Sequence, residues 1–152
     1  MTTIRGVWAP SEKAAGDPSA PPPAPGNAAP AVLLGGSEDT RLLLRGLLRL
    51  HRHPVLLEAR APDEIGRLPI SPETKVLILD AGTDGGPTWS ETLSGVLRTR
   101  ADLKALVILP TSDPALETRA REAGARAVLV RPFAIRDFIE AVDSVAAERA
   151  PA

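Results

Sequence analysis

Short apolar runs alternate with helix-forming segments along this chain, and that alternation constrains its fold more than any other feature. The five runs are residues 31–35, 55–57, 76–80, 105–109 and 127–130. The run at 76–80 is apolar up to Asp80, which is typical of a strand covered on both faces. Apolar residues at helical spacing predict helices at 38–51, 88–100, 114–123 and 134–148, and a weaker helical turn at 62–68.

Capping residues support the boundaries of these helices. Ser37 and Asp113 each precede a predicted helix and suit the N-cap position. Gly124 follows a predicted helix and suits a left-handed C-cap. Strands that alternate with helices indicate a parallel sheet with right-handed crossovers and helices on both faces. We therefore predict one doubly wound α/β domain with a five-stranded parallel sheet over residues 30–149.

The segment before this domain has a different composition. Its prolines are frequent, with seven of the sixteen in the chain lying within the first 30 residues. With few apolar residues and no periodicity, such a segment cannot offset the entropy lost on ordering. We predict that residues 1–29 form a disordered tail rich in Ala and Pro. Trp8 stands out within it, either as part of a docking peptide or as a side chain that packs on its own domain or has no role.

Composition excludes several classes of function. The chain has no cysteine, which rules out disulfides and thiolate metal sites and suits a reducing compartment. His51 and His53 are its two histidines and lack the further ligands of a metal site, so no bound metal is expected. A formal net charge of −1 gives no reason to expect nucleic-acid binding. Because there is neither an apolar run of roughly 18 residues nor a signal peptide, we predict a cytoplasmic protein without membrane insertion.

Enzymatic chemistry is poorly supported by the sequence. No serine of the chain lies in the G-x-S-x-G pattern of a nucleophile elbow. General acid–base catalysis would need two carboxylates in one cleft. The chain offers Asp80 and at best Asp84 for that purpose. We predict that the protein is not an enzyme.

The residues that follow the apolar runs form the candidate site. Ligands of parallel α/β sheets bind outside the carboxyl ends of the strands. The run at 76–80 ends in Asp80, and the run at 127–130 is followed by Arg131 and Pro132. We therefore expect a carboxylate and a guanidinium to lie at the same edge of the sheet.

The first apolar run ends in a glycine-rich turn, Gly35-Gly36-Ser37. A turn of this kind before a helix can bind an anion through its N–H groups. Gly35–Ser37 is thus a candidate for a phosphate or nucleotide site. The other interpretation is that the glycines serve the conformation of the turn.

These segments resemble the response-regulator receiver family over about residues 30–148. The most specific match is Gly124–Phe133, which is similar to the family's Gly-Ala…Leu-Val-Lys-Pro-Phe ending. Leu77–Asp80 resembles the strand that ends in the phosphoaccepting aspartate. The resemblance implies a flavodoxin-like (βα)5 fold, a phosphoacceptor position at Asp80 and a cis peptide bond before Pro132.

The chain departs from this family at the positions that carry its chemistry. Gly35 and Gly36 stand where the family has two acidic residues. Pro110 stands where a Thr or Ser ends the fourth strand, and Arg131 replaces the lysine of the last strand. The resemblance therefore implies a degenerate receiver, in which Asp80 alone remains of the active set.

A lone Asp80 is a poor site for phosphoryl chemistry. Phosphoryl transfer depends on charge neutralisation, and Mg²⁺ needs several oxygen ligands. Glu38 and Asp39 are weak replacements, because they follow the strand end and lie in the first turn of the helix. Arg131 can instead grip a carboxylate with both arms of its guanidinium. We predict an ion pair between Asp80 and Arg131; the alternative is that Arg131 faces solvent and Asp80 is hydrated. We also predict no cofactor; the alternative is bound Mg²⁺ if Asp80 is phosphorylated.

Arginine-rich surfaces are the candidate sites for a protein partner. The stripe along the first predicted helix, interpreted as a solvated face or as a contact for an acidic partner, contains Arg41, Arg45, Arg49 and Arg52. The output face that the resemblance implies lies over the helices at 114–123 and 134–148, which also form a candidate homodimer face. Together with the tail, the predicted interaction surface comprises Arg119, Arg121, Arg126, Phe133 and Trp8.

The function expected from these observations is protein–protein signalling. We expect an atypical, stand-alone receiver-like protein that binds a histidine kinase or another signalling protein independently of phosphorylation. The chain ends soon after its last predicted helix, so no effector domain is expected. The alternatives are a single-domain response regulator phosphorylated on Asp80 in a two-component phosphorelay and, more weakly, an anion or nucleotide sensor at Gly35–Ser37.

Overall fold

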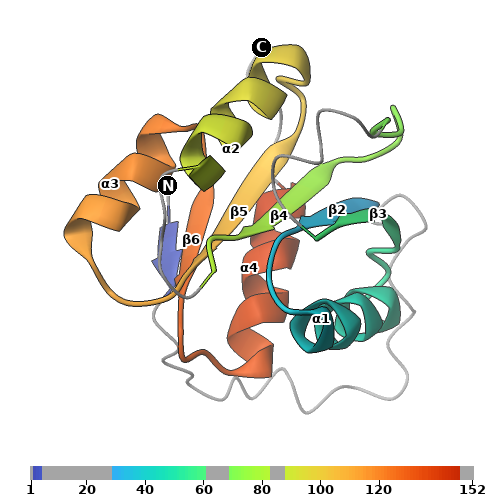
Figure 1. Ribbon diagram of the computed structural model, residues 1–152. Coiled ribbons are helices and arrows are strands. Elements are labelled where there is room, and N and C mark those ends of the chain that lie inside the picture. The colour runs from blue at the N-terminus through green and yellow to red at the C-terminus, as the bar shows by residue number, and fades with distance from the viewer. Residues whose placement is uncertain (1, 5–28, 61–68, 83–87, 148–152) are drawn as a thin grey trace.

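A parallel β-sheet runs through the middle of the computed structural model, which describes residues 2–4, 29–60, 69–82 and 88–147. The strands follow the order β1-β6-β5-β4-β2-β3, and all neighbours are parallel (Figure 1). They are β1 Thr2–Ile4, β2 Ala31–Leu34, β3 Val55–Ala59, β4 Val76–Asp80, β5 Lys104–Leu109 and β6 Ala127–Val130. The predicted doubly wound α/β fold is confirmed, but the sheet has six strands and not the predicted five.

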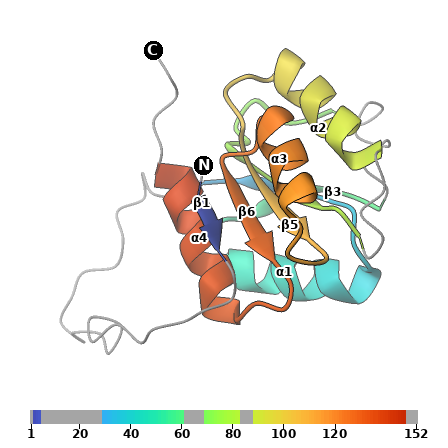
Figure 2. The same cartoon turned by 90° about the vertical axis from the view of Figure 1, so that its left-hand side faces the viewer.

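The described helices cover both faces of the sheet. They are α1 Glu38–Leu50, α2 Thr88–Thr99, α3 Pro114–Glu122 and α4 Ile135–Ala147. Helices α2 and α3 lie on one face and α1 and α4 on the other (Figures 1 and 2). Ser37 and Asp113 cap α1 and α3 as predicted, and Gly124 has a positive φ of 108°. None of these four helices has both the length and the apolar character of a membrane span.

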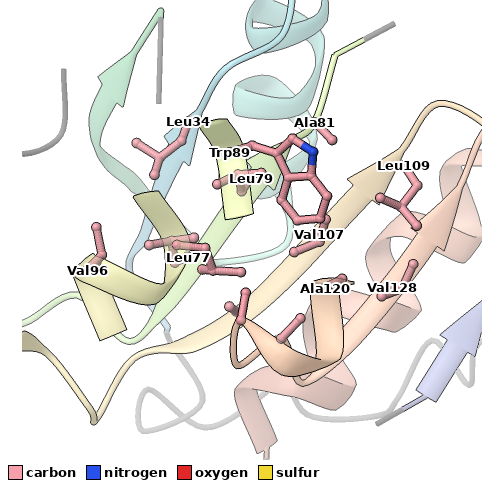
Figure 3. Packing of buried hydrophobic residues seen from close by; sticks show 14 of the residues in the cluster. Leu34, Leu77, Leu79, Ala81, Trp89, Val96, Val107, Leu109, Ala120 and Val128 are labelled. Carbon is pink, nitrogen blue, oxygen red and sulfur yellow. The ribbon is translucent and has the colours of Figure 1, made fainter. Parts of the chain in front are cut away.

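Two apolar clusters fill the space between the layers. On one face, Trp89 of α2 and Ala120 of α3 pack with strand residues, and Figure 3 shows the Trp89 ring directed at the sheet. On the other face, Leu48 of α1 and Phe138 of α4 pack in the same way. Every residue of Val76–Asp80 is buried, since β4 lies inside the sheet and both of its faces are covered. Burial on both faces explains why the sequence of β4 is apolar without alternation up to Asp80.

The prediction of a disordered tail over residues 1–29 is wrong for Thr2–Ile4 and for Ala29. Thr2–Ile4 form the sixth strand, in register with Ala127–Leu129 of β6, and Ala29 is buried against the domain. Without β1, the edge of β6 would present unpaired N–H and C=O groups, which any extended segment can satisfy. Three residues are too few to show strand periodicity in a sequence. Trp8 and the predicted helical turn at 62–68 lie outside the described residues.

The leucines of α1 do not all face the core. Leu44 and Leu48 are buried, but Leu43 and Leu50 are exposed, as is Leu42. At 100° per residue the leucines span a wider arc than the stripe a helix can bury against a sheet. Part of α1 therefore presents an apolar surface to solvent.

Arg100, at the end of α2, ties the segment before β4 to the domain. Its guanidinium donates to the carbonyl oxygens of Ser71 and Thr74, each at 3.0 Å, and to the carboxylate of Asp102. The hydrogen bond to Arg100 lowers the pKa of Asp102 below its usual value. This contact fixes the chain that enters β4 and so supports the strand that carries Asp80.

We predict that deleting residues 2–4 increases amide hydrogen exchange in β6. The amides of Ala127–Val130 that face β1 would exchange at least about tenfold faster, because they would then lie on an open sheet edge. Amides of β4, in the middle of the sheet, serve as the internal control and should not change. Unchanged exchange throughout β6 would show that β1 does not pair in solution.

Candidate functional site

The candidate site lies where the order of the strands reverses. The chain passes from β2 outward to β3 and then returns to β4 on the other side of β2. Such a switch point, at the carboxyl ends of the strands, is the usual place for a site in this class of fold. The register pairs Leu34 with Leu79 and Leu109 with Val130, so the loops after β2, β4 and β6 meet at one edge.

Asp80 and Arg131 form a bidentate ion pair at this edge, as predicted. Arg131 Nη1 donates to Asp80 Oδ1 at 2.8 Å, and Nη2 donates to Oδ2 at 2.6 Å. The Asp80 side chain is 5 % exposed and that of Arg131 is 29 % exposed. The hydrogen bonds to Asp80 raise the pKa of Arg131 above its ordinary value and outweigh the effect of burial. The pair spans from β4 to β6 across the end of β5.

A backbone amide completes the contacts of the carboxylate. The N–H of Gly82 donates to Asp80 Oδ1 at 2.8 Å. Oδ1 therefore accepts two hydrogen bonds, and Oδ2 accepts the one from Arg131. Both oxygens of Asp80 are engaged by this chain itself.

Gly36 lies directly against the Asp80 carboxylate. A Cβ atom added at Gly36 would come within 2.8 Å of Asp80 Oδ2, and the residue has a φ of 81°. Gly35 likewise has a positive φ, of 77°. These are conformations that side chains other than glycine adopt at a cost. With Asp80 in this position, there is no room for the acidic side chain that the resemblance would place at Gly36.

Arg41 lies at the candidate site, which the sequence did not reveal. Instead of lying on a solvated stripe, it is 8 % exposed and donates to the carbonyl oxygen of Gly36 at 2.6 Å. It also reaches the carbonyl oxygen of Gly35 at 3.4 Å. Arg45, one turn further along α1, binds Glu58 of β3 at 2.8 Å. The short spacing between the glycines and Arg41 could have indicated this contact. However, arginines at helical spacing are equally typical of a solvent-exposed helix face, so the sequence does not distinguish the two.

The described residues do not fit a divalent cation at this edge. Asp80 is paired with Arg131, and the carbonyl oxygens of the Gly35-Gly36 turn accept from Arg41. Glu38 and Asp39 are exposed in the first turn of α1. Within the part of the chain that the structure describes, no three His, Cys, Asp or Glu residues are grouped as metal ligands. The chain's own guanidiniums provide the positive charge instead.

Several polar groups of the glycine-rich turn are bound by the protein itself. The N–H of Gly35 donates to the carbonyl of Ala59 at 2.8 Å, and Ser37 Oγ caps α1 by accepting from the N–H of Thr40. The carbonyl oxygens of Gly35 and Gly36 accept from Arg41. These contacts favour the conformational interpretation of the glycines.

The switch position holds no hydroxyl. Pro110 follows β5 directly and is partly exposed, while Thr111 beside it is exposed. The N–H of Arg131 donates to the carbonyl of Leu109 at 3.0 Å, just before Pro110. The end of β5 is thus fixed by backbone pairing, and its side chains contribute nothing to the Asp80 contacts.

Phe133 packs within the domain instead of projecting freely. Its ring stacks with that of Phe138 at a centroid distance of 6.2 Å. The guanidinium carbon of Arg131 lies 5.9 Å from the Phe133 centroid. The peptide bond between Arg131 and Pro132 is cis, as the resemblance implied. Phe133 therefore helps to position Arg131.

The predicted interaction surface is not continuous. Arg126 precedes β6 and its N–H donates to the carbonyl of Ala105, at the amino edge of the sheet. Phe133 follows β6 at the opposite, carboxyl edge. Arg119 and Arg121 lie in the last turn of α3, and Trp8 is outside the described residues. Arg126 and Phe133 thus lie at opposite ends of β6, and the binding of a partner by these residues stays a prediction.

The two histidines have separate structural roles. His51 is the C-cap residue of α1, and its N–H donates to carbonyls of the last turn. His53 is 3 % exposed, and its Nε2 lies 2.6 Å from Asp143 Oδ1. This contact joins the end of α1 to α4. It was not predicted, because 90 residues separate the two partners in sequence.

Comparisons with known proteins find the fold but no sequence match. Neither protein-family models nor curated proteins match the sequence. Among solved structures, a response regulator from Thermotoga maritima matches with a TM-score of 0.67 and 18 % identity, over 79 % of this chain and 99 % of that one. The chain has the fold of a response-regulator receiver domain. The assignment of the phosphoacceptor position to Asp80 and of the lysine position to Arg131, which the resemblance implied, stays a prediction.

Further structures with the receiver fold match equally well. A LuxR-family two-component response regulator from Aurantimonas matches with a TM-score of 0.69 and 20 % identity, over 81 % of this chain and 88 % of that one. The non-phosphorylated HemR receiver domain from Leptospira biflexa matches with a TM-score of 0.67 and 20 % identity, over 81 % and 98 %. These structures share the fold of this chain at no more than 20 % sequence identity.

We predict that breaking the Asp80–Arg131 pair from the arginine side is the more damaging change. Arg131→Ala leaves a buried, uncompensated carboxylate and should lower the free energy of unfolding by about 2–4 kcal/mol. Asp80→Ala leaves a partly exposed arginine and should lower it by about 1–2 kcal/mol. Urea unfolding of both variants and the double variant gives the coupling energy. The exposed Arg98→Ala is the control, and additive effects would contradict a direct pair.

We predict that Gly36→Ala destabilises the fold through Asp80. The positive φ and the contact with Oδ2 should lower the free energy of unfolding by about 2 kcal/mol or more. In an Asp80→Ala background the same substitution should have a smaller effect. Gly46→Ala, a helical position with open space around its Cβ, is the matched control and should be neutral or stabilising. Equal loss in both backgrounds would rule out the contact with Asp80.

Proposed function

We propose that this protein is a receiver-like signalling module that acts through protein–protein contacts without phosphorylation of Asp80. The observation that carries the proposal is the engagement of both Asp80 oxygens by Arg131 and Gly82. A phosphoacceptor needs one carboxylate oxygen free to attack and a cation beside it to neutralise the incoming phosphoryl group. Here the cation is a guanidinium that already binds the attacking oxygens.

A guanidinium differs from a divalent ion in ways that support this proposal. It is covalently attached to the protein, so it cannot dissociate as a metal ion can. Two of its N–H groups bind the carboxylate and fix its orientation. To accept a phosphoryl group, Asp80 would have to release Arg131 and turn an oxygen toward solvent. Gly36, packed against Oδ2, would then need to move as well.

The partner in this proposal is another signalling protein in the cytoplasm, such as a histidine kinase. Two solved proteins with the same fold are described as response regulators in two-component or LuxR-family systems. No enzymatic activity and no cofactor form part of the proposed role. In this proposal the partner binds the outer surface of the domain, because Asp80 at the sheet edge is already bound to Arg131.

Phosphorylation of Asp80 in a phosphorelay is the competing function. Its support is the position of Asp80 at the carboxyl end of β4, next to the switch point of the sheet. The anion-sensor alternative has weaker support, because the Gly35 N–H is used within the sheet edge.

The proposal predicts that the amide NMR spectrum does not respond to phosphoryl mimics. We expect no saturable shifts on addition of millimolar Mg²⁺ followed by beryllofluoride, because Asp80 remains bound to Arg131. The variant Arg131→Lys provides the comparison, since lysine keeps the charge but not the bidentate grip. Incubation with acetyl phosphate and Mg²⁺ should leave wild-type protein unlabelled by intact mass.

Two results would reject the proposed function in favour of the phosphorelay. One is saturable shifts at Asp80 and at the neighbours of Gly35 and Pro110 in the wild-type spectrum. The other is a phosphoryl adduct on the wild-type protein that disappears in Asp80→Asn.

A further inference from the structure

The outward face of α1 carries an apolar cluster that the domain does not use. Leu42, Leu43 and Leu50 are 58 %, 55 % and 78 % exposed. They account for three of the five large apolar side chains that are exposed in the described part of the chain. Single exposed leucines need no explanation, but a contiguous group of them on one helix is typical of an interaction surface.

This group and a glycine line an open, shallow hollow. The hollow has a volume of about 770 Å³ and is lined by Leu42, Leu43, Gly46, Leu47, Arg49, Leu50 and Arg52. A Cβ atom at Gly46 would have nothing within 4 Å. Packing within the domain therefore does not require a glycine there, and glycine weakens the middle of a helix. A small residue between leucines does let a second helix approach closely, because the spacing of packed helices depends on the side chains at the contact.

The charges along α1 indicate what that second helix is. The helix begins with Glu38 and Asp39, its last turn contains Arg49, and Arg52 lies beyond its end. Its exposed face thus runs from acidic, through apolar, to basic residues. An antiparallel copy of the same helix would place the acidic end of each copy beside the basic end of the other.

The spacing about Gly46 supports the same arrangement. Leu42 lies four residues before Gly46 and Leu50 lies four residues after it. Asp39 lies seven residues before and Arg52 six residues after. With a two-fold axis at Gly46, Leu42 of one copy meets Leu50 of the other, and Asp39 meets Arg52. Such self-complementarity is what an isologous dimer requires.

We propose that the protein self-associates through α1, packed antiparallel against α1 of a second copy with the two helices crossing at Gly46. This surface is distinct from the edge that carries Asp80, and the proposal does not depend on whether Asp80 accepts a phosphoryl group. One helix pair is small compared with the interface of a stable dimer. The dimer is therefore weak, with a dissociation constant on the order of 10–100 µM.

The absence of cysteine from the chain allows a direct test by single-cysteine cross-linking. Helices that cross at 8–10 Å bring facing Cα atoms to within about 4–5 Å, which is compatible with a disulfide. We expect Gly46→Cys to form a covalent dimer under mild oxidation. The control is Glu140→Cys, at an exposed position on α4, and it should remain monomeric under the same conditions.

The direction of the helices is tested by mixing two cysteine variants. When Leu42→Cys and Leu50→Cys are oxidised together, an antiparallel pair gives mainly the mixed disulfide between positions 42 and 50. A parallel pair gives the two symmetric disulfides, and that result would overturn the proposed arrangement.

Sedimentation equilibrium from about 10 µM to 1 mM measures the same interface without cross-links. Asp39→Arg should weaken association about fivefold, and adding Arg52→Asp should restore it, since aspartate tolerates the positive φ at that position. Leu43→Glu should abolish the dimer, whereas Leu56→Glu, at an exposed leucine on β3, should not. A wild-type protein that remains monomeric at 1 mM would overturn the proposal and leave the face to a different protein.

Discussion

The hydrogen-bonded pair of Asp80 and Arg131 is the interaction on which the carboxyl edge of the sheet depends. It joins β4 to β6 across the end of β5 and leaves neither carboxylate oxygen free. The conformation of the carboxylate in turn explains Gly36, because a side chain there would collide with Oδ2. Phe133 supports the pair from the other side by packing close to the guanidinium. The departures from the receiver pattern are thus physically connected.

Two guanidiniums supply positive charge at this edge of the sheet. Arg131 neutralises Asp80, and Arg41 binds the carbonyl oxygens of the glycine turn. A bound metal ion can keep coordination positions open for a substrate. The guanidiniums of Arg131 and Arg41 instead donate hydrogen bonds to oxygen atoms of the protein. These contacts favour a rigid carboxyl edge of the sheet. We therefore assign the proposed signalling role to the outer surfaces of the domain.

The structure shows which candidate surface residues are engaged in contacts within the domain. The edge of β6 is covered by β1, and Phe133 is packed against Phe138. Arg41 and Arg45 are tied to the turn and to Glu58. The leucine face of α1, by contrast, is exposed around Gly46. Helix α1 therefore connects the two proposals: its inner side holds the glycine turn through Arg41, and its outer side is the surface proposed for self-association.

The sequence by itself determined the strand and helix order, the fold class and the placement of Asp80 and Arg131 at one edge. Those features follow from local periodicity and from the rule that parallel strands end together. The burial of Arg41, the His53–Asp143 contact and the packing of Phe133 on Phe138 were decided by tertiary structure. So were the strand formed by Thr2–Ile4 and the exposure of Leu42 and Leu50. Each depends on which segments distant in sequence become neighbours, and hydrophobic periodicity carries no information about those partners.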